Sequence, residues 1–314
     1  MSTNAKNLTG VIVPMITPLT AQGRIDGLAV ERIVRHFCRA DARPFVLGTT
    51  GESASLSHDL RQDLVRLTRM STPSHVPVYA GISDNCLAYS LEAAKRFADL
   101  GVDAVVAHLP SYYPLNPEQI LCYYERLADG VALPLVLYNI PSTTHMSIPL
   151  DVADKLSFHP RVIGMKDSER NLERLNASLE LWAGRDDFSF LVGWARQSAY
   201  ALARGARGIV PSTGNIVPGL YNRLWQAAVN GSPEKAQEYQ DLTDHISELY
   251  QKERTLAGSL AALKVILSEL GLCEEHVLPP LVPVTDLERQ SIVEGVTRLN
   301  LRATACLPAD SRPA

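Results

Sequence analysis

Lys166 is the residue whose position in this sequence best suits covalent chemistry. It stands near the end of an apolar, strand-like run at 162–167, whereas the other six lysines occupy terminal, helical or loop positions. Burial disfavours the ammonium form of a lysine and leaves more free amine, which is the form that attacks a ketone. The sequence therefore makes Lys166 a candidate nucleophile for Schiff-base formation. A structural ion pair is the alternative, and Lys166 alone does not decide between the two.

Polar side chains gather where other apolar runs end. These segments are GTTGES at 48–53, PSYYP at 110–114, YNIPSTTH at 138–145, KDS at 166–168 and PSTGN at 211–215. A Thr-Thr turn flanked by glycine offers hydroxyl and backbone N–H donors to a carboxylate, and a tyrosine donates and accepts a proton through one oxygen. If these ends meet, they supply the groups that acid–base chemistry at an imine requires.

The elements that must position these residues are short apolar strands alternating with helices. We expect strands at 11–17, 44–49, 76–82, 104–110, 133–139, 162–167, 189–193 and 208–212. We expect helices at 28–40, 57–71, 86–100, 117–129, 149–156, 169–180, 194–204 and 218–230. Eight such units match an α/β (β/α)8 TIM barrel, whose active sites lie at the carboxyl ends of the strands. An open doubly wound sheet is the competitor, but it usually carries a G-x-G-x-x-G loop, which this chain lacks.

The alternation of strands and helices stops after Gly231. The segment 233–301 is typical of about three further helices, the clearest at 255–270, where leucines recur at helical spacing. We therefore expect a catalytic barrel at 1–231 and a C-terminal helical extension at 232–314, frayed beyond Cys306.

The composition narrows the class of protein. The chain has 314 residues, 46% of them hydrophobic, a net charge of −4 and no basic stripe that would indicate nucleic acid. The N-terminus lacks an apolar signal segment, and no apolar run approaches the ~18 residues that span a membrane. Five scattered cysteines without a C-x-x-C pair favour reduced thiols in a cytoplasm. The eight histidines form no H-x-H or H-E-x-x-H pair, so we expect no catalytic metal.

Five motifs occur together and in order: GTTGES, PSYYP, YNIP, GMKDS and GIVPSTGN. On these motifs the chain resembles the dihydrodipicolinate synthase / N-acetylneuraminate lyase family of class I aldolases, over about residues 8–300. The resemblance implies a (β/α)8 barrel with C-terminal helices and Schiff-base chemistry on pyruvate or a related 2-oxo acid. It also implies that no cofactor takes part and that the protein is a homotetramer built as a dimer of dimers.

The resemblance further assigns roles to residues of this chain. Lys166 matches the imine-forming lysine, and Tyr138 matches the tyrosine that moves protons at the imine carbon and the aldol oxygen. Thr49 and Thr50 match the pair that binds the 2-oxo acid carboxylate, and Thr49 also matches the hydroxyl of a proton relay. Tyr113 matches a tyrosine that crosses a dimer interface to complete the neighbouring relay. The remaining expected substrate contacts are Gly48, Thr143, Ser168, Gly193 and Val210, the last through its backbone carbonyl.

Two positions depart from the pattern of the best-known members. The synthases carry an arginine two residues after the proline of their Tyr-Asn-x-Pro motif, where this chain has Thr143. A neutral hydroxyl cannot replace a bidentate guanidinium. The neuraminate lyases carry acidic residues after the glycine that ends strand 7, whereas Gly193 is followed here by Trp194, Ala195 and Arg196. Both departures weaken the assignment of either of those two substrates.

We therefore expect cleavage of a 2-keto-3-deoxy sugar acid to pyruvate and an aldehyde, or dehydration through the same imine. The hydroxyls of Thr143, Thr144 and Ser168 suit sugar hydroxyl groups, while Arg196 and His145 are either distal substrate contacts or solvated residues. Four alternatives stay open: dihydrodipicolinate synthase proper, N-acetylneuraminate lyase proper, a metal-dependent class II aldolase, and a catalytically inactive barrel that binds a 2-oxo acid.

Overall fold

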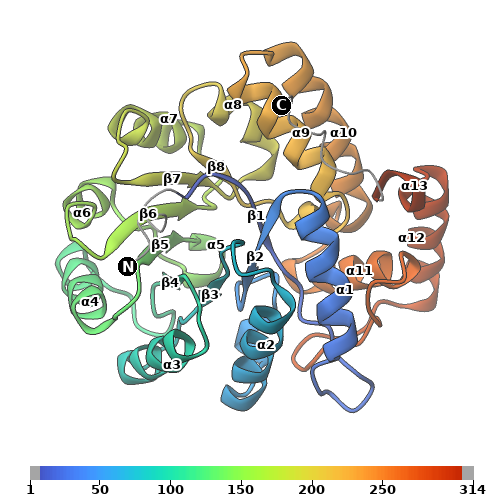
Figure 1. Cartoon of the computed structure of the whole chain (residues 1–314), viewed down its shortest axis with the longest axis horizontal. Helices are drawn as coiled ribbons and strands as arrows, with labels where there is room; N and C mark the ends of the chain where they lie inside the picture. The colour runs from blue at the N-terminus through green and yellow to red at the C-terminus, as the bar shows by residue number, and fades with distance from the viewer. Residues whose placement is uncertain (1–7, 306–314) are drawn as a thin grey trace.

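The computed structural model describes residues 8–305 and contains a closed barrel of eight parallel strands that follow one another in chain order (Figure 1). The last strand pairs with the first and closes the sheet. The strands are β1 (Gly10–Pro14), β2 (Ala42–Val46), β3 (Tyr79–Gly81), β4 (Ala104–His108), β5 (Leu135–Asn139), β6 (Val162–Asp167), β7 (Ser189–Val192) and β8 (Gly208–Ile209). The predicted TIM-barrel fold is confirmed.

Helices follow each strand and cover the outside of the barrel. They are α1 (Gly27–Arg39), η2 (Ser53–Ser55), α2 (His58–Ser71), α3 (Leu87–Asp99), α4 (Pro117–Gly130), α5 (Pro141–Thr144), α6 (Leu150–Leu156), α7 (Leu172–Trp182), η3 (Ala195–Gln197), α8 (Ser198–Leu202), η4 (Ser212–Asn215) and α9 (Pro218–Val229). The helix expected at 194–204 is split into η3 and α8, and α5 was not expected. Several strands are shorter than expected, because apolar residues such as Ile16 and Leu47 are buried in loops rather than paired in the sheet.

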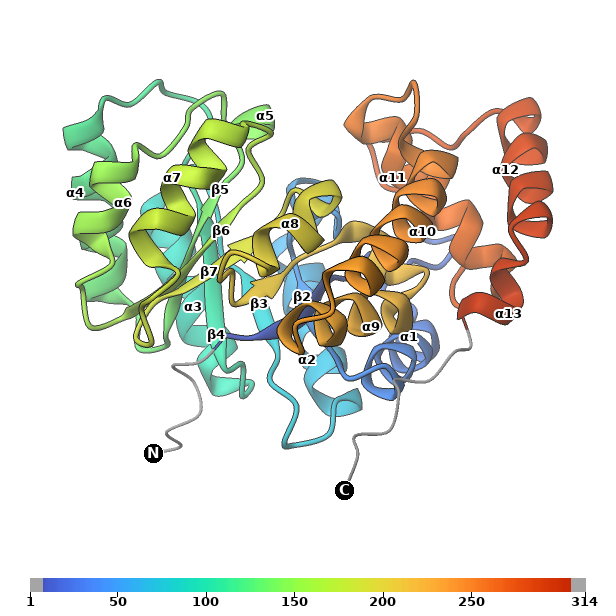
Figure 2. The same cartoon turned by 90° about the horizontal axis from the view of Figure 1, so that it is seen from above.

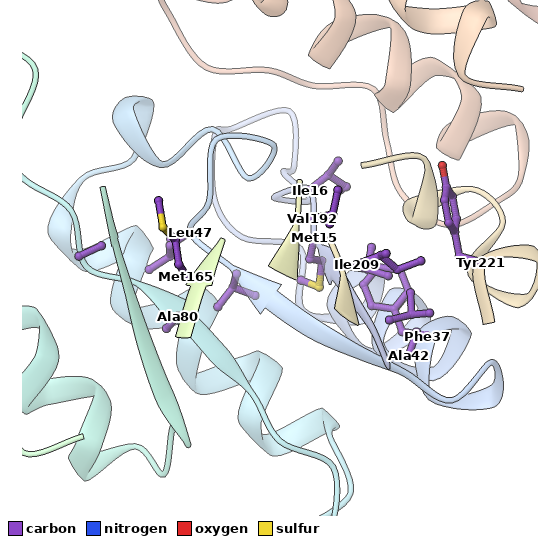
Figure 3. Close-up of a cluster of buried hydrophobic side chains, with 14 of the residues drawn as sticks. Met15, Ile16, Phe37, Ala42, Leu47, Ala80, Met165, Val192, Ile209 and Tyr221 are labelled. Carbon is purple, nitrogen blue, oxygen red and sulfur yellow. The ribbon is translucent and has the colours of Figure 1, made fainter. Parts of the chain in front are cut away.

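The chain has two separate apolar cores, which follow from the period of two along each strand. Residues that point inward fill the barrel, among them Ile12, Phe45 and Val136. Their outward-pointing neighbours pack against the helices in a much larger cluster, part of which is drawn in Figure 3, including Met15 and Met165. Each fully buried side chain of this kind contributes roughly 1.5–3 kcal/mol. Together the two cores hold the strand ends in fixed positions relative to one another.

The C-terminal segment forms four helices, α10 (Pro233–Gln251), α11 (Leu256–Glu269), α12 (Asp286–Arg298) and α13 (Leu301–Ala305), where about three were expected. Figure 2 shows them grouped on the side of the molecule away from α4, α6 and α7. The proposed boundary at residue 231 falls in the turn between α9 and α10, and the predicted frayed tail lies outside the described residues. Within residues 8–305, no helix combines the length and hydropathy that crossing a membrane requires.

Candidate active site

Two side chains on neighbouring strands point into the barrel side by side. Tyr138 on β5 pairs in register with Lys166 on β6, and both side chains are buried. The Nζ atom of Lys166 lies 3.9 Å from the centroid of the Tyr138 ring and 5.1 Å from that of Phe45 on β2. Two aromatic rings thus flank the amine, and Lys166 is only 5% exposed. This placement suits a nucleophilic amine.

The next register pair, Asn139 and Asp167, points outward and fixes β5 to β6. The Asn139 amide donates to Asp167 at 3.0 Å and to Glu169 at 2.9 Å, and Arg174 Nε donates to Asp167 at 2.6 Å. Burial raises the pKa of the Asp167 carboxyl, although the Arg174 guanidinium opposes that shift. These bonds tie Asp167 to β5 and to Arg174, and its carboxylate lies on the face of the strand opposite to Lys166.

A tight turn after β2 brings the two threonines over the lysine. The Gly51 N–H donates to the Gly48 carbonyl at 3.0 Å, and the Glu52 N–H donates to the Thr49 carbonyl at 3.1 Å. The Thr49 hydroxyl lies 3.4 Å from the Tyr138 hydroxyl, a long hydrogen bond of the kind that often tightens only when substrate binds. The two hydroxyls thus lie within hydrogen-bonding reach of each other beside Lys166, which is the geometry that a proton relay requires.

This turn is anchored by an ion pair that sequence reasoning missed. Glu52, with a positive φ of 54°, contacts Lys264 of α11, and the closest nitrogen–oxygen distance is 2.5 Å. Both side chains are essentially unexposed, and Lys264 also donates to the His276 carbonyl. Burial lowers the pKa of Lys264, and the carboxylate of Glu52 opposes that shift. In the sequence Lys264 resembles any helical lysine. Its burial depends on α11 being covered on all sides, which the sequence does not show.

We expect the Lys264→Met substitution to destabilise the protein by about 3–5 kcal/mol, because it leaves the Glu52 carboxylate buried without a counter-charge. Urea unfolding of the variant would measure this loss. The double variant Glu52→Gln/Lys264→Met removes both charges and should recover part of that stability. A Lys264→Met protein as stable as the native one would show that the pair is unimportant. The exposed Lys235 of α10 provides a matched control in Lys235→Met.

A cavity of about 480 Å³ opens above Lys166 at the carboxyl ends of the strands. Seven of the ten residues expected at the site line it: Thr49, Thr50, Tyr138, Lys166, Ser168, Gly193 and Val210. Gly193 approaches Ser168 so closely that a Cβ atom at 193 would lie 2.1 Å from the serine hydroxyl. Glycine is therefore required at 193 if Ser168 is to keep this position.

The other three expected residues do not line the cavity. Gly48 contributes its carbonyl to the turn described above. The Thr143 hydroxyl donates to the Ile140 carbonyl at 3.3 Å, and Thr144 is buried and bonded to the backbone in a similar way. Tyr113 lies in the loop before α4, is 69% exposed and packs edge-on against Tyr112. Tyr113 therefore lies outside the cavity that Tyr138 and Thr49 line in the same chain.

Two histidines near the site have structural explanations. Burial lowers the pKa of His108, so its neutral ring donates Nδ1–H to the Leu109 carbonyl at 2.8 Å. His145 ends α5 in the left-handed conformation, with φ 58°, and is exposed. Neither histidine lines the cavity above Lys166.

The C-terminal helices contribute a wall of the cavity that the sequence did not indicate. Tyr250, Gln251 and Arg254 line it from the end of α10 and the turn that follows. The Tyr250 hydroxyl lies 2.7 Å from Ser212 Oγ, and Gln251 donates to the same hydroxyl at 2.7 Å. No local sequence signal marks these residues, because only the packing of α10 against α8, α9 and η4 brings them to the site.

An eight-stranded barrel with a buried lysine beside hydrogen-bonded tyrosine and threonine hydroxyls is typical of the class of lysine-dependent aldolases. The comparisons with known proteins agree. A model of the dihydrodipicolinate synthetase family matches residues 7–299, so the chain belongs to that family. It is a class I aldolase-type lyase that acts on a small 2-oxo acid.

Individual relatives match over nearly their whole length. The chain is 30% identical to a 4-hydroxy-tetrahydrodipicolinate synthase of Methanosarcina mazei, over 93% of this chain and 98% of that one. The solved dihydrodipicolinate synthase of Bacteroides thetaiotaomicron is 33% identical, with a TM-score of 0.88 and coverage of 93% and 98%. YagE, an E. coli K12 prophage protein of the same family solved with pyruvate, is 25% identical, with a TM-score of 0.88 and coverage of 94% and 99%.

Proposed function

We propose that this protein cleaves a 2-keto-3-deoxy sugar acid into pyruvate and an aldehyde. The observation that carries the proposal is the position of Thr143, where the synthases carry an arginine. Its hydroxyl turns to the Ile140 carbonyl, so the loop after β5 offers no clamp for an amino-acid carboxylate. The cavity of about 480 Å³ is instead wide and polar, within the range typical of small-molecule sites.

The reaction begins when the substrate carboxylate binds at Thr49 and Thr50 and the Lys166 amine adds to C2. Tyr138 protonates the hydroxyl of the adduct, water leaves, and a protonated imine forms. The Tyr138 oxygen then takes the proton of the C4 hydroxyl, the C3–C4 bond breaks, and its electrons form an enamine while C4 becomes an aldehyde. Tyr138 next protonates C3. Water adds to the imine, returns a proton to Tyr138 and releases pyruvate with the free amine.

Dehydration would use the same residues. The Tyr138 oxygen takes a proton from C3 of the imine, which gives the enamine, and Tyr138 then returns that proton to the C4 hydroxyl, which leaves as water. Cleavage and dehydration therefore share the imine at Lys166 and differ in which bond to C4 breaks. Product analysis by mass spectrometry distinguishes them, because only cleavage releases pyruvate.

The second candidate is 4-hydroxy-tetrahydrodipicolinate synthase, the name carried by the curated relative from M. mazei. We expect 2-keto-3-deoxygluconate to show a kcat/KM at least ~30-fold above that for pyruvate with aspartate semialdehyde, because the missing carboxylate clamp costs ~2–5 kcal/mol. N-acetylneuraminate should also be poor, since Ala195 and Arg196 replace the acidic residues of its lyases. Steady-state assays of the three reactions measure this. Efficient condensation with aspartate semialdehyde would instead establish the synthase.

We also propose that Tyr113 completes the relay of a second copy of the chain, in a dimer that pairs again into a tetramer. The exposure of an adjacent tyrosine pair on one loop supports this, because large aromatic side chains are favoured at protein interfaces. The free thiols of the four cysteines in the described residues fit the proposal of a reducing, cytoplasmic location.

Mixing Lys166→Ala subunits with Tyr113→Phe subunits should restore activity. A hybrid dimer contains one site with both Lys166 and the partner's Tyr113, so random pairing should yield about a quarter of native activity. In the matched control, the Lys166→Ala subunit is replaced by Lys166→Ala/Tyr113→Phe, which cannot supply Tyr113 to the site of its partner. Equal activity in both mixtures, or an active monomer in sedimentation, would count against a shared site.

A further inference from the structure

Three arginines from three separate elements line the cavity above Lys166. Arg170 follows β6, Arg196 lies in η3, and Arg254 lies in the turn between α10 and α11. Glu169 is the one carboxylate among the described residues that line this cavity. It accepts a hydrogen bond from Asn139 at 2.9 Å and lies 3.4 Å from Arg174, which also pairs with Asp167. The walls around Lys166 therefore carry three guanidinium groups and one carboxylate.

The three arginines differ in the exposure of their side chains and in the hydrogen bonds and ion pairs that they make. Arg196 is 50% exposed and pairs with Glu248 at 3.2 Å. Arg170 is exposed. Arg254 is only 18% exposed, donates one bond to the Leu249 carbonyl at 3.2 Å, and has a buried Nε with no hydrogen-bond partner in the described residues. The Oε1 atom of Glu288 lies 3.8 Å from Nε, while Oε2 of Glu288 accepts from the N–H and the hydroxyl of Thr285.

A guanidinium that is largely buried and keeps unused donors is a prepared anion site. Arg254 lines the cavity and makes one hydrogen bond, to Leu249, so its guanidinium keeps further donors, and a bond from such a donor to an anion is charge-assisted and among the stronger hydrogen bonds. A planar guanidinium also matches the geometry of a carboxylate. Because Lys166 lies on the floor of the same cavity, an anion at Arg254 would belong to the far end of the substrate that forms the imine.

We propose that Arg254, assisted by Arg170 and Arg196, binds a second carboxylate at the end of the substrate away from the keto group. The substrate is then a 2-keto-3-deoxy aldaric acid, with one carboxylate at Thr49 and Thr50 and the other at the C-terminal helices. This inference rests on the proposed cleavage or dehydration and names its substrate class. A carboxylate fits better than a phosphate, because Glu288 beside Arg254 would repel a doubly charged group more strongly.

The test compares three substrates that differ in the group at C6. They are 2-keto-3-deoxyglucarate, 2-keto-3-deoxygluconate and 2-keto-3-deoxy-6-phosphogluconate, which end in a carboxylate, a hydroxymethyl and a phosphate. We expect the native protein to have the highest kcat/KM for the glucarate derivative. Arg254→Gln should lower that value ~30-fold or more, the range for losing one partner of a buried charge pair, and change the gluconate value less than threefold.

Two controls separate this inference from the function on which it rests. Arg289→Gln removes an arginine of α12 that pairs with Glu269 and Glu275 and does not line the cavity, so it should change no substrate preference. Borohydride trapping of pyruvate at Lys166 does not involve the distal group and should be unchanged in Arg254→Gln, which also shows that the variant is folded. Failure of the native protein to trap pyruvate would overturn the proposed function.

If pyruvate is trapped at Lys166 but the native protein does not prefer 2-keto-3-deoxyglucarate, only the inference of a second carboxylate is overturned. Equal losses for glucarate and gluconate in Arg254→Gln would do the same, because the effect would then be structural. A preference for the phosphorylated acid would overturn the choice of a carboxylate. The charge-preserving Arg254→Lys variant should recover part of the lost kcat/KM for 2-keto-3-deoxyglucarate. Lysine keeps the attraction to the distal carboxylate but lacks the planar guanidinium that binds it through two hydrogen bonds.

Discussion

Lys166→Arg is expected to abolish turnover and to prevent any covalent pyruvate adduct. Arginine keeps the positive charge over the Tyr138 and Phe45 rings but stays protonated and forms no imine. Removal of a catalytic nucleophile costs at least about 10⁴-fold in turnover in well-studied enzymes, and we expect a loss on that scale. Incubation with pyruvate and borohydride, followed by peptide mass spectrometry, locates the reduced adduct in the native protein.

The control for this experiment is Lys235→Arg, which alters an exposed lysine of α10 and should leave both the adduct and the rate unchanged. Lys166→Ala complements the arginine variant, because it removes the amine without adding bulk to the cavity floor. A reduced adduct on any other lysine would refute the mechanism. Absence of an adduct in the native protein would favour a barrel that binds a 2-oxo acid without catalysis.

Tyr138→Phe is expected to lower kcat by ~10² or more, which is the contribution of a positioned acid–base group. The substitution removes one hydroxyl, 3.4 Å from Thr49 Oγ1, and keeps the ring against Nζ of Lys166. The ammonium–ring contact and the packing of the barrel interior therefore survive. Steady-state kinetics should show the loss mainly in kcat, and pyruvate trapping should still occur, though more slowly.

Tyr79→Phe is the matched control, since it removes a hydroxyl from an inward-facing tyrosine of β3 that does not line the main cavity. Burial raises the pKa of Tyr79 to about 12, and its hydroxyl lies outside the cavity in which the substrate would bind. We expect its kcat to be near the native value. A folded Tyr138→Phe protein with native turnover would remove Tyr138 from the mechanism.

The strand–helix alternation made the barrel predictable, because parallel strands buried on both faces appear as short apolar runs that recur between helical segments. The ends of those runs were less predictable. Ile16 and Leu47 lie beyond their strands but are as buried as paired residues, so composition does not distinguish them. The fourth C-terminal helix, α13, is only five residues long and carries little periodicity.

Some residues of the site were also predictable from the sequence, and others were not. Lys166 and Tyr138 were predictable, because the two-residue period of a strand places both inside the barrel once the register is set. Thr143 carried the right chemistry in the sequence, but its hydroxyl bonds to the nearby Ile140 carbonyl, as short polar side chains in turns often do. Local sequence does not reveal whether such a hydroxyl binds the backbone or a substrate.

By itself the sequence determined the chemistry at the strand ends, which is that of an amine, a tyrosine and a threonine pair. The residue types supply the groups, and the alternation along strands that neighbour one another in chain order directs them to one site. Only the tertiary structure decided the far wall of the cavity and the anchor of the threonine turn. Arg254 reaches the cavity, and Lys264 reaches Glu52, because α10 and α11 fold back beside the barrel. Lys264 and Glu52 are separated by more than 200 residues, so neither local propensity nor periodicity records their contact. Substrate choice, on our proposal, depends on that long-range packing, whereas imine formation depends on the strands alone.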